Sequence, residues 1–317
     1  MNGEALARFN KELESYATLS RPPLQSVLVI HRGNIIAEHY WRGFSATSYQ
    51  NVFSITKSVT SALIGMALAD GKLTLDDTLA HWFPEVNVMP EAHAASVTIR
   101  HLLTMTAGFQ KAPARTPSGD PNTALLQRGG VNTPGEKFRY ANEDVDLLIP
   151  ILERAAGVPA MDYAHTRLFV PLGIWRNVAK SSRKRLWKTD KQGHVKGSQG
   201  LHLTTHELAA FGQLYLQGGR WQNEQLVPAE FIAASTTAQV TGGYPERVKY
   251  GYLWWVSVDS EGRAAFFASG AGGQYLYVLP ALELIVVITS ALKNLAGFAH
   301  RVMIVRLATD LINASAD

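Results

Sequence analysis

The stretch FSITKSV, residues 53–59, places a hydroxyl and an amine three positions apart, at Ser54 and Lys57. It opens a segment that is typical of a buried helix from about Ser54 to Ala69, ending near Gly71. Residues three apart on a helix share a face, so the two polar groups are expected to lie together. Burial lowers the pKa of a lysine, which lets its amine accept the serine proton. The pattern predicts a nucleophile beside its own base, although a capping serine and a solvent-seeking lysine would give the same letters.

A second polar motif is FRYANEDVD, residues 138–146, which holds a tyrosine and an asparagine two positions apart. In an extended chain such residues point to the same side, so Tyr140 and Asn142 can face one cleft. Tyr140 can shuttle a proton between Ser54, Lys57 and a leaving group. Asn142 can hydrogen-bond Lys57 or a substrate carbonyl. A structural tyrosine and a helix-capping asparagine are the alternative interpretation.

The third motif is FFASGAGGQYLYV, residues 266–278, in which Gly270, Gly272 and Gly273 interrupt a predicted strand. Glycine within a strand indicates close approach by a ligand or another backbone. A backbone N–H from this stretch, paired with that of Ser54, would form an oxyanion hole. A tight hairpin turn would use the same glycines.

Strand-like segments lie at both ends of the chain. SVLVIHRGNIIAEHYW (26–41) predicts a hairpin around Arg32-Gly33-Asn34, and four more strands are expected at 250–258, 263–269, 274–280 and 283–290. Helices are expected at 98–108, 142–157, 161–173, 204–219 and 296–314. The pattern predicts an α+β fold with one antiparallel sheet built from both chain ends. We expect residues 1–75 and 206–317 to form the sheet-containing lobe and residues 76–205 a mainly helical lobe.

Composition excludes several classes of protein. With 317 residues, 46% of them hydrophobic, the chain can bury a large core, and without cysteine it has no disulfide, thiolate zinc site or catalytic thiol. The start is charged and amphipathic, unlike a secretory signal, and no run of about 18 apolar residues exists. We therefore expect a soluble, cytoplasmic protein; a leader trimmed from the sequence would change that expectation.

Two other signals are weaker. The net charge of +4 comes largely from KSSRKRLWKTDK (180–191), which favours a solvated loop over a nucleic-acid site because only Trp187 is interleaved. His202 and His206 have a spacing that can hold zinc, but Thr204 and its neighbour look like a helix cap that breaks it. We expect no metal and no cofactor, and the sequence has no G-x-S-x-G elbow, P-loop or dinucleotide-binding fingerprint.

Taken in order, S-x-x-K, Y-x-N and the glycine-broken strand resemble the serine β-lactamase and penicillin-binding protein superfamily. The closer likeness is to the branch of class C β-lactamases, D-alanyl-D-alanine carboxypeptidases, family VIII carboxylesterases and 6-aminohexanoate-dimer hydrolases. Further similar stretches are HLLTMTAGF (101–109), TPGEKFRYAN (133–142), LFVPLGI (168–174), the W-x-x-D-x-x-G run at 187–193, and 200–219. The resemblance implies a β-lactamase/transpeptidase-like fold with the active site between its lobes. It also implies that Ser54 is the nucleophile, Lys57 its base or proton store, and Tyr140 their catalytic partner.

The chain departs from this group at one triplet. Lactamases and carboxypeptidases of the group carry K-T-G or H-T-G on the late strand, where the cation helps to hold a substrate carboxylate. Here Ala268-Ser269-Gly270 stands at that place, and no Lys or His lies between Arg263 and Gln274. The pattern is more similar to the 6-aminohexanoate-dimer hydrolases. By that likeness Ala271 N–H is the second oxyanion donor, and Ser269 and Asn142 bind substrate.

These observations predict a serine hydrolase that forms an acyl-enzyme on Ser54, and within that class a carboxylesterase acting on small esters. The alternatives are an amide hydrolase of the 6-aminohexanoate-dimer type, a β-lactamase or D-Ala-D-Ala peptidase and, more distantly, a catalytically silent binding module. The expected partner is a small ester or amide, with no nucleic acid and no membrane; the oligomeric state stays open. Specificity is expected in loops such as 110–132, and Arg263 or the basic residues of 183–191 are candidates to replace the missing cation.

Overall fold

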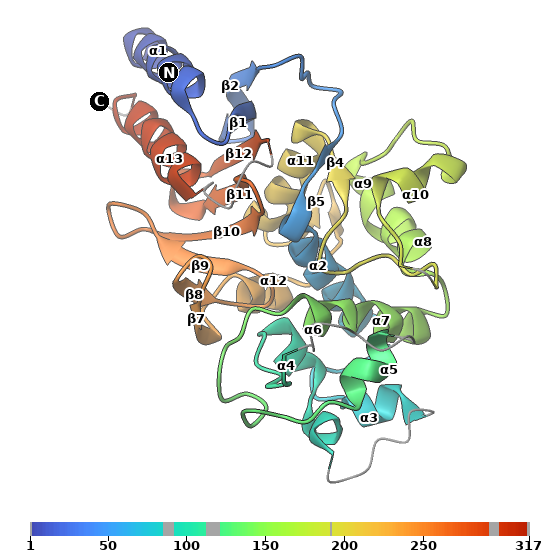
Figure 1. Ribbon diagram of the computed structural model, residues 1–317. Coiled ribbons are helices and arrows are strands. Elements are labelled where there is room, and N and C mark those ends of the chain that lie inside the picture. The colour runs from blue at the N-terminus through green and yellow to red at the C-terminus, as the bar shows by residue number, and fades with distance from the viewer. Residues whose placement is uncertain (1, 85–91, 112–120, 191, 292–297, 316–317) are drawn as a thin grey trace.

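An eight-stranded antiparallel sheet lies at the centre of the computed structural model (Figure 1), which describes residues 2–84, 92–111, 121–190, 192–291 and 298–315. Its strand order is β2-β1-β12-β11-β10-β9-β8-β7. The strands are β1 (Leu24–His31), β2 (Asn34–Tyr40), β7 (Val240–Gly243), β8 (Val248–Tyr250), β9 (Trp255–Val258), β10 (Ala264–Gly270), β11 (Gln274–Leu279) and β12 (Leu284–Ser290). Since β1 pairs with β12, the two chain ends share one sheet, and the predicted α+β architecture is confirmed.

The two hairpins that the glycines predicted are both present. His31 pairs with Asn34 across a two-residue loop in which Arg32 and Gly33 have φ values of 50° and 74°. Two positive φ angles match the right-handed twist of the flanking strands, which explains why a glycine occupies this loop. Between β10 and β11, Gly270 pairs with Gln274 around a turn that contains Gly272 and Gly273.

The strand expected over 250–258 is wrong as a single element, because Gly251–Trp254 leaves the ladder between β8 and β9. There Tyr252 N donates to Ser235 O at 3.1 Å, and Leu253 N donates to Leu103 O at 3.0 Å. Ser235 ends α12 (Ala229–Ser235). A Cβ atom at Gly251 would lie 1.9 Å from Ser235 O, so only glycine permits this approach. The segment therefore exchanges sheet bonds for bonds to helical parts of the chain.

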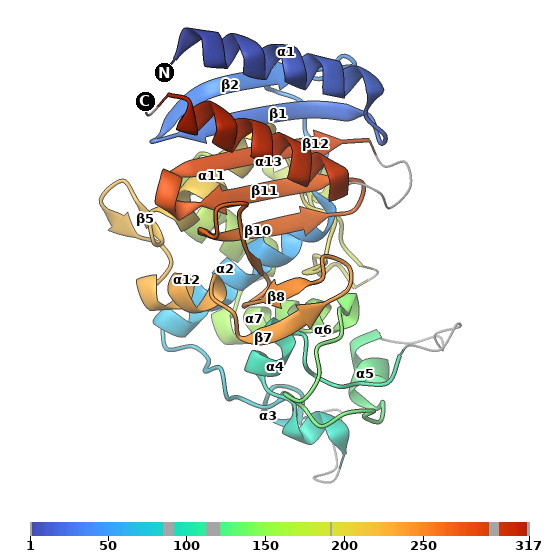
Figure 2. The ribbon, with the colours of Figure 1, turned by 90° about the vertical axis from the view of Figure 1, so that its left-hand side faces the viewer.

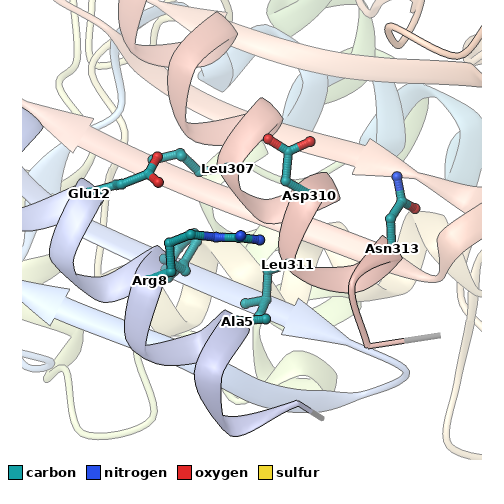
Figure 3. Close-up of a pocket in the computed structure, with 8 residues that line it drawn as sticks. Ala5, Arg8, Glu12, Leu307, Asp310, Leu311 and Asn313 are labelled. Carbon is teal, nitrogen blue, oxygen red and sulfur yellow. The ribbon is translucent and has the colours of Figure 1, made fainter. Parts of the chain in front are cut away.

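Helices cover both faces of the sheet (Figure 2). On one face α1 (Gly3–Leu19) lies beside α13 (Phe298–Asn313), and on the other α11 (Thr205–Leu216) packs against β1, β11 and β12. The two chain ends meet where Asn2 N donates to Ser315 Oγ at 3.0 Å. Between α1 and α13 lies a pocket of about 420 Å³ (Figure 3), whose lining residues come only from these two helices and include none of the predicted site residues.

The middle of the chain is mainly helical, in shorter elements than the sequence predicted. From the sheet side α2 (Thr56–Ala69) packs against α7 and α12. The other elements are α3 (Leu79–Trp82), α4 (Ile99–Leu103), α5 (Pro121–Leu126), α6 (Asn142–Asp146), α7 (Leu148–Ala156), α8 (Ala160–Ala164), α9 (Val170–Leu172) and α10 (Arg183–Leu186), with the short pairs β3 (Gln50–Asn51)–β4 (His202–Leu203) and β5 (Arg220–Trp221)–β6 (Glu224–Gln225). A π-helical turn, His165–Phe169, joins α8 to α9, so the helix expected over 161–173 is present over residues 160–172 but is not α-helical throughout.

The basic run is more ordered than a loop. It contains a 3₁₀ turn at Lys180–Ser182 and α10, after which Trp187 is fully buried and donates its indole N–H to Lys196 O at 3.0 Å. Lys191 lies outside the described residues. Across the described ranges, none of the helices has both the length and the apolar content that crossing a membrane requires.

Candidate active site

The sequence predicted that Ser54 lies in the first turn of an α-helix. In the structure it lies instead in a strained turn that precedes the helix. Residues Phe53–Ile55 form a 3₁₀ turn ahead of α2, and Phe53 has a φ of 46°. Its backbone is held on both sides, since Phe53 N donates to Asn51 Oδ1 at 2.9 Å and Thr56 Oγ1 donates to Phe53 O at 2.6 Å. A non-glycine residue in this region costs about 1–3 kcal/mol and persists only where the surroundings hold it. These bonds therefore fix the direction in which Ser54 points.

The end of β10 lies directly against this turn. A Cβ atom at Gly270 would come within 2.4 Å of Val52 O, so the strand can approach the turn that carries Ser54 only because this residue is glycine. Ser54 and the β10–β11 turn consequently line one pocket of about 230 Å³. The lining residues are Ser54, Tyr140, Tyr244, Pro245, Glu246, Trp255, Ser269, Gly270, Ala271, Gly272, Gly273 and Tyr275.

Lys57 is buried behind Ser54, with 1% of its surface exposed. Its Nζ lies 2.9 Å from Ser54 Oγ, 2.7 Å from Asn142 Oδ1 and 2.8 Å from Ser198 O. The amide oxygen of Asn142 and the carbonyl of Ser198 can only accept hydrogen bonds. A neutral amine donates its two hydrogens to them and turns its lone pair to the Ser54 hydroxyl. Burial lowers the pKa of Lys57 to about 7, against the opposing effect of nearby carboxylates.

The peptide group before the Ser198 carbonyl, between Gly197 and Ser198, is held by two bonds that the sequence did not predict. Ser198 N donates to Asp146 Oδ1 at 2.9 Å, and Thr60 Oγ1 of α2 donates to Gly197 O at 2.8 Å. Burial raises the pKa of Asp146, and its hydrogen bonds to Ser198 act in the opposite direction. Asp146 is the last residue of the FRYANEDVD motif, so that motif supplies three site residues, not two. Ser198 carries no signal of its own in the sequence.

Tyr140 and Asn142 reach the same lysine, as their spacing predicted. The Lys57 Nζ lies 4.8 Å from the centre of the Tyr140 ring, which stacks on Trp255 at 5.7 Å and 15°. Burial raises the pKa of Tyr140 to about 12, although its contact with Ser54 lowers it, so the phenol keeps its proton at neutral pH. The capping interpretation of Asn142 is wrong: Ala141 is the N-cap of α6, and the Asn142 side chain bonds Lys57.

A second polar cluster lines the same pocket, around Glu246 in the β7–β8 turn. Ser269 Oγ donates to Glu246 Oε1 at 2.6 Å, and Tyr275 OH donates to the same oxygen at 3.1 Å. Arg301 Nη2, from α13, donates to Oε2 at 3.2 Å. The sequence predicted Ser269 as a pocket residue but missed both Glu246 and Arg301. The Ser269 hydroxyl, expected to bind substrate, donates to the Glu246 carboxylate in this structure.

The cations proposed as replacements for the missing lysine are elsewhere. Arg263 pairs with Asp259 Oδ2 at 2.6 Å and with Glu261 at 3.1 Å. Across the described part of the chain, neither Arg263 nor the basic run contributes to the pocket lining. The described residues of the loop at 110–132 do not line the pocket either, and residues 112–120 lie outside the described ranges. Arg301 is the cation that pairs with Glu246 of the pocket lining.

The two histidines with zinc-like spacing diverge. Thr204 caps α11 in a capping box with Glu207, as its sequence predicted, and this separates His202 on β4 from His206 in the helix. His206 Nε2 contacts Glu38 Oε1 at 2.8 Å, whereas His202 Nδ1 lies 3.1 Å from Gly200 O. Among the residues that the structure describes, no group of three or more His, Asp or Glu side chains is arranged to hold a metal ion.

Comparison with known proteins gives consistent matches. The family model described as Beta-lactamase matches residues 21–309. The 6-aminohexanoate-dimer hydrolase of Paenarthrobacter ureafaciens is 23% identical over 321 residues, covering 90% of this chain and 76% of that protein. The octameric penicillin-binding protein homologue of Pyrococcus abyssi superposes with a TM-score of 0.75 at 20% identity, over 96% of this chain and 77% of its own. EstCE1, a hydrolase with promiscuous acyltransferase activity, superposes with a TM-score of 0.77 at 17% identity, over 98% of this chain and 99% of its own.

Proposed function

The chain belongs to the beta-lactamase family, and from this premise we propose that it is a serine hydrolase that forms an acyl-enzyme on Ser54 and acts on small esters. One observation carries the proposal: Lys57 Nζ lies 2.9 Å from Ser54 Oγ while two acceptor-only groups occupy its other hydrogens. A nucleophile within hydrogen-bond reach of an oriented base is the arrangement that covalent hydrolysis requires.

The proposed reaction begins with transfer of the Ser54 hydroxyl proton to neutral Lys57. Ser54 Oγ then bonds to the carbonyl carbon, and the N–H groups of Ser54 and Ala271 stabilise the oxyanion. Tyr140, which stays protonated at neutral pH, gives its proton to the departing alkoxide and regains one from Lys57. The carbon–oxygen bond breaks and leaves an ester on Ser54. Water attacks this ester by the same sequence of proton transfers, which releases the acid and restores Ser54.

The pocket wall supports esters over carboxylate-bearing substrates. No Lys, Arg or His occurs among the residues that line the pocket in the described part of the chain. A carboxylate placed there would lose a charge-assisted contact worth about 1.5–3 kcal/mol. Amide hydrolysis is the second candidate, because a relative covering 90% of this chain carries the name 6-aminohexanoate-dimer hydrolase. An alkoxide leaves more easily than an amine, which places esters first.

The decisive experiment is covalent labelling with a fluorophosphonate, followed by peptide mapping. We expect one adduct, on Ser54, and no adduct and no ester turnover in Ser54→Ala. Ser58→Ala is the matched control: Ser58 lies on the same helix but donates its hydroxyl to Leu253 O at 2.8 Å, so labelling should persist. An adduct that maps to Ser58 or Ser269 would overturn the assignment, and absence of any adduct would favour a silent binding module.

Substrate class is tested by comparing kcat/KM for nitrophenyl butyrate, a linear amide and a chromogenic cephalosporin at one pH. We expect the ester to be the best substrate and the cephalosporin the slowest. Equal efficiency on ester and cephalosporin would replace the esterase proposal by a β-lactamase. A preference for the amide would favour the 6-aminohexanoate-dimer type of hydrolase.

A further inference from the structure

The pocket that Ser54 lines is also lined by a carboxylate. Glu246 lines the pocket, although only 5% of its side chain is exposed. Its Oε1 accepts hydrogen bonds from Ser269 and Tyr275, which also line the pocket. This carboxylate therefore lies at the strand where the β-lactamase group places a cation.

Arg301 does not reverse this charge inside the pocket. It donates to the other oxygen, Oε2, and is absent from the residues that line the pocket. Its guanidinium carbon lies 4.1 Å from the centre of the Phe267 ring and 4.8 Å from that of Phe298, so aromatic faces hold it behind the wall. Because electrostatic attraction falls with distance, a ligand in the pocket experiences Glu246 more strongly than Arg301.

The rest of the lining suits an organic cation. Four aromatic residues, Tyr140, Tyr244, Trp255 and Tyr275, contribute to a pocket of about 230 Å³, which is large enough for a substituted ammonium group. Aromatic rings beside a carboxylate recognise alkylammonium groups through cation–π and ionic attraction. The remaining lining residues are uncharged, so nothing among the described lining opposes a positive ligand.

We propose that Glu246 is a specificity-determining residue: it makes the pocket beside Ser54 select substrates that carry an ammonium group and exclude those that carry a carboxylate. This inference rests on the proposed serine hydrolase function and adds the charge of its substrate. It gives Glu246 a role in substrate selection in addition to its hydrogen bond with Ser269 of β10.

The first test uses the wild-type protein and three nitrophenyl esters of matched length. They are the 4-(trimethylammonio)butanoate, its neutral isostere 5,5-dimethylhexanoate, and the monoester of adipate. We expect kcat/KM to fall in that order, with roughly a tenfold or larger difference between the cationic and anionic esters. Equal values, or an anionic ester that exceeds the neutral one, would overturn the proposal.

The second test removes the charge with Glu246→Gln, which preserves the shape of the side chain and an acceptor for Ser269. The ratio of cationic to anionic kcat/KM should fall about tenfold or more, since the wall loses its charge. Glu261→Gln is the matched control, because its carboxylate is half exposed, pairs with Arg263 and does not line the pocket. A structural role for Glu246 would instead lower turnover of all three esters by the same factor.

A binding measurement separates failure of this inference from failure of the proposed function. Calorimetric binding of the three esters to Ser54→Ala tests the charge preference without any chemistry at Ser54. If wild-type protein fails to label with fluorophosphonate but Ser54→Ala still binds the cationic ester best, the hydrolase proposal is wrong and the subsite stands. If labelling succeeds and the three esters bind alike, the hydrolase stands and the subsite is wrong.

Discussion

Two buried polar clusters contribute to the site around Ser54, and they differ in the partners of their charged side chains. Behind Ser54, Lys57 contacts Asn142 and Ser198, which are neutral acceptors. In the other cluster, Glu246 forms an ion pair with Arg301 at 3.2 Å. In the first cluster burial is not offset by a contacting anion, and the pKa of Lys57 falls to about 7. In the second, each side chain has a side chain of opposite charge as its hydrogen-bond partner.

This difference in partners suits the Lys57 cluster to a change of protonation and the Glu246 cluster to a fixed charge in a binding site. A buried group with neutral partners changes its protonation easily, as a catalytic base must near neutral pH. A buried group with an opposite charge beside it holds its charge and can act as a fixed feature of a binding site. Each of the following changes alters one of the two clusters or the tyrosine that lies beside both.

The largest effect is expected from Lys57→Arg, which abolishes the reactive cluster while keeping a positive charge. Guanidinium does not release its proton in proteins, so kcat should fall by roughly 10²- to 10⁴-fold. Lys188→Arg, at an exposed position in the basic run, should leave kcat unchanged. The measurement is steady-state ester hydrolysis. An active Lys57→Arg protein would mean that Lys57 only anchors Ser54 electrostatically.

Arg301→Met gives the Glu246 cluster the character of the Lys57 cluster, a buried charge without a countercharge. Breaking a buried pair in this way should reduce the free energy of unfolding by about 3–5 kcal/mol. The control is Arg32→Met: Arg32 pairs with Glu283 at 3.6 Å with 71% of its side chain exposed, and such pairs are worth at most about 1 kcal/mol. Urea unfolding compares the two variants, and similar losses in both would show that the buried pair is not special.

Tyr140→Phe tests the residue that stands between the clusters, with its ring near Lys57 and its stack on Trp255. We expect kcat to fall about 10²-fold, because the leaving group loses its proton donor. The acid limb of the pH profile should stay in place, since Lys57 sets it. If that limb moves with the Tyr140→Phe change, Tyr140 rather than Lys57 is the titrating base.

Asn142→Asp should have the smallest effect and is the sharpest test of the comparison, because it gives Lys57 the contacting anion that it lacks. In the wild type, activity should rise with pH through about 7 as the amine loses its proton. A carboxylate at 2.7 Å favours the ammonium form, so the limb should move upward by about one pH unit, with about fivefold less activity at pH 7. Asn313→Asp, near the chain end, is the control, and an unmoved limb in Asn142→Asp would contradict the role of neutral partners.

The two clusters also differ in how far the sequence predicted them. Ser54, Lys57, Tyr140 and Asn142 belong to two short motifs whose spacing places them on one face. Glu246 and Arg301 are 55 residues apart, and nothing local in the β7–β8 turn or in α13 indicates that they meet. The pairing exists only because α13 packs on the sheet.

The same limit applies to the fold. The sheet and its hairpins follow from alternation and glycine, which are local signals. The break at Gly251–Trp254 depends on the carbonyls of Ser235 and Leu103, which belong to distant helices. The 3₁₀ turn at Ser54 likewise depends on Asn51 and Thr56 holding a strained backbone, and helical periodicity alone does not reveal strain.

The burial of Lys57 also couples the folding equilibrium to pH. An unfolded lysine keeps its proton up to its ordinary pKa of 10.5, whereas the folded protein releases this proton above about pH 7. Between those values the unfolded state binds one more proton, so the free energy of unfolding rises with pH through that window. The full difference corresponds to roughly 5 kcal/mol, absent below pH 7 and complete above 10.5. Above about pH 7, where the Lys57 amine is neutral, the fold therefore begins to recover the stability that burying the charged amine costs.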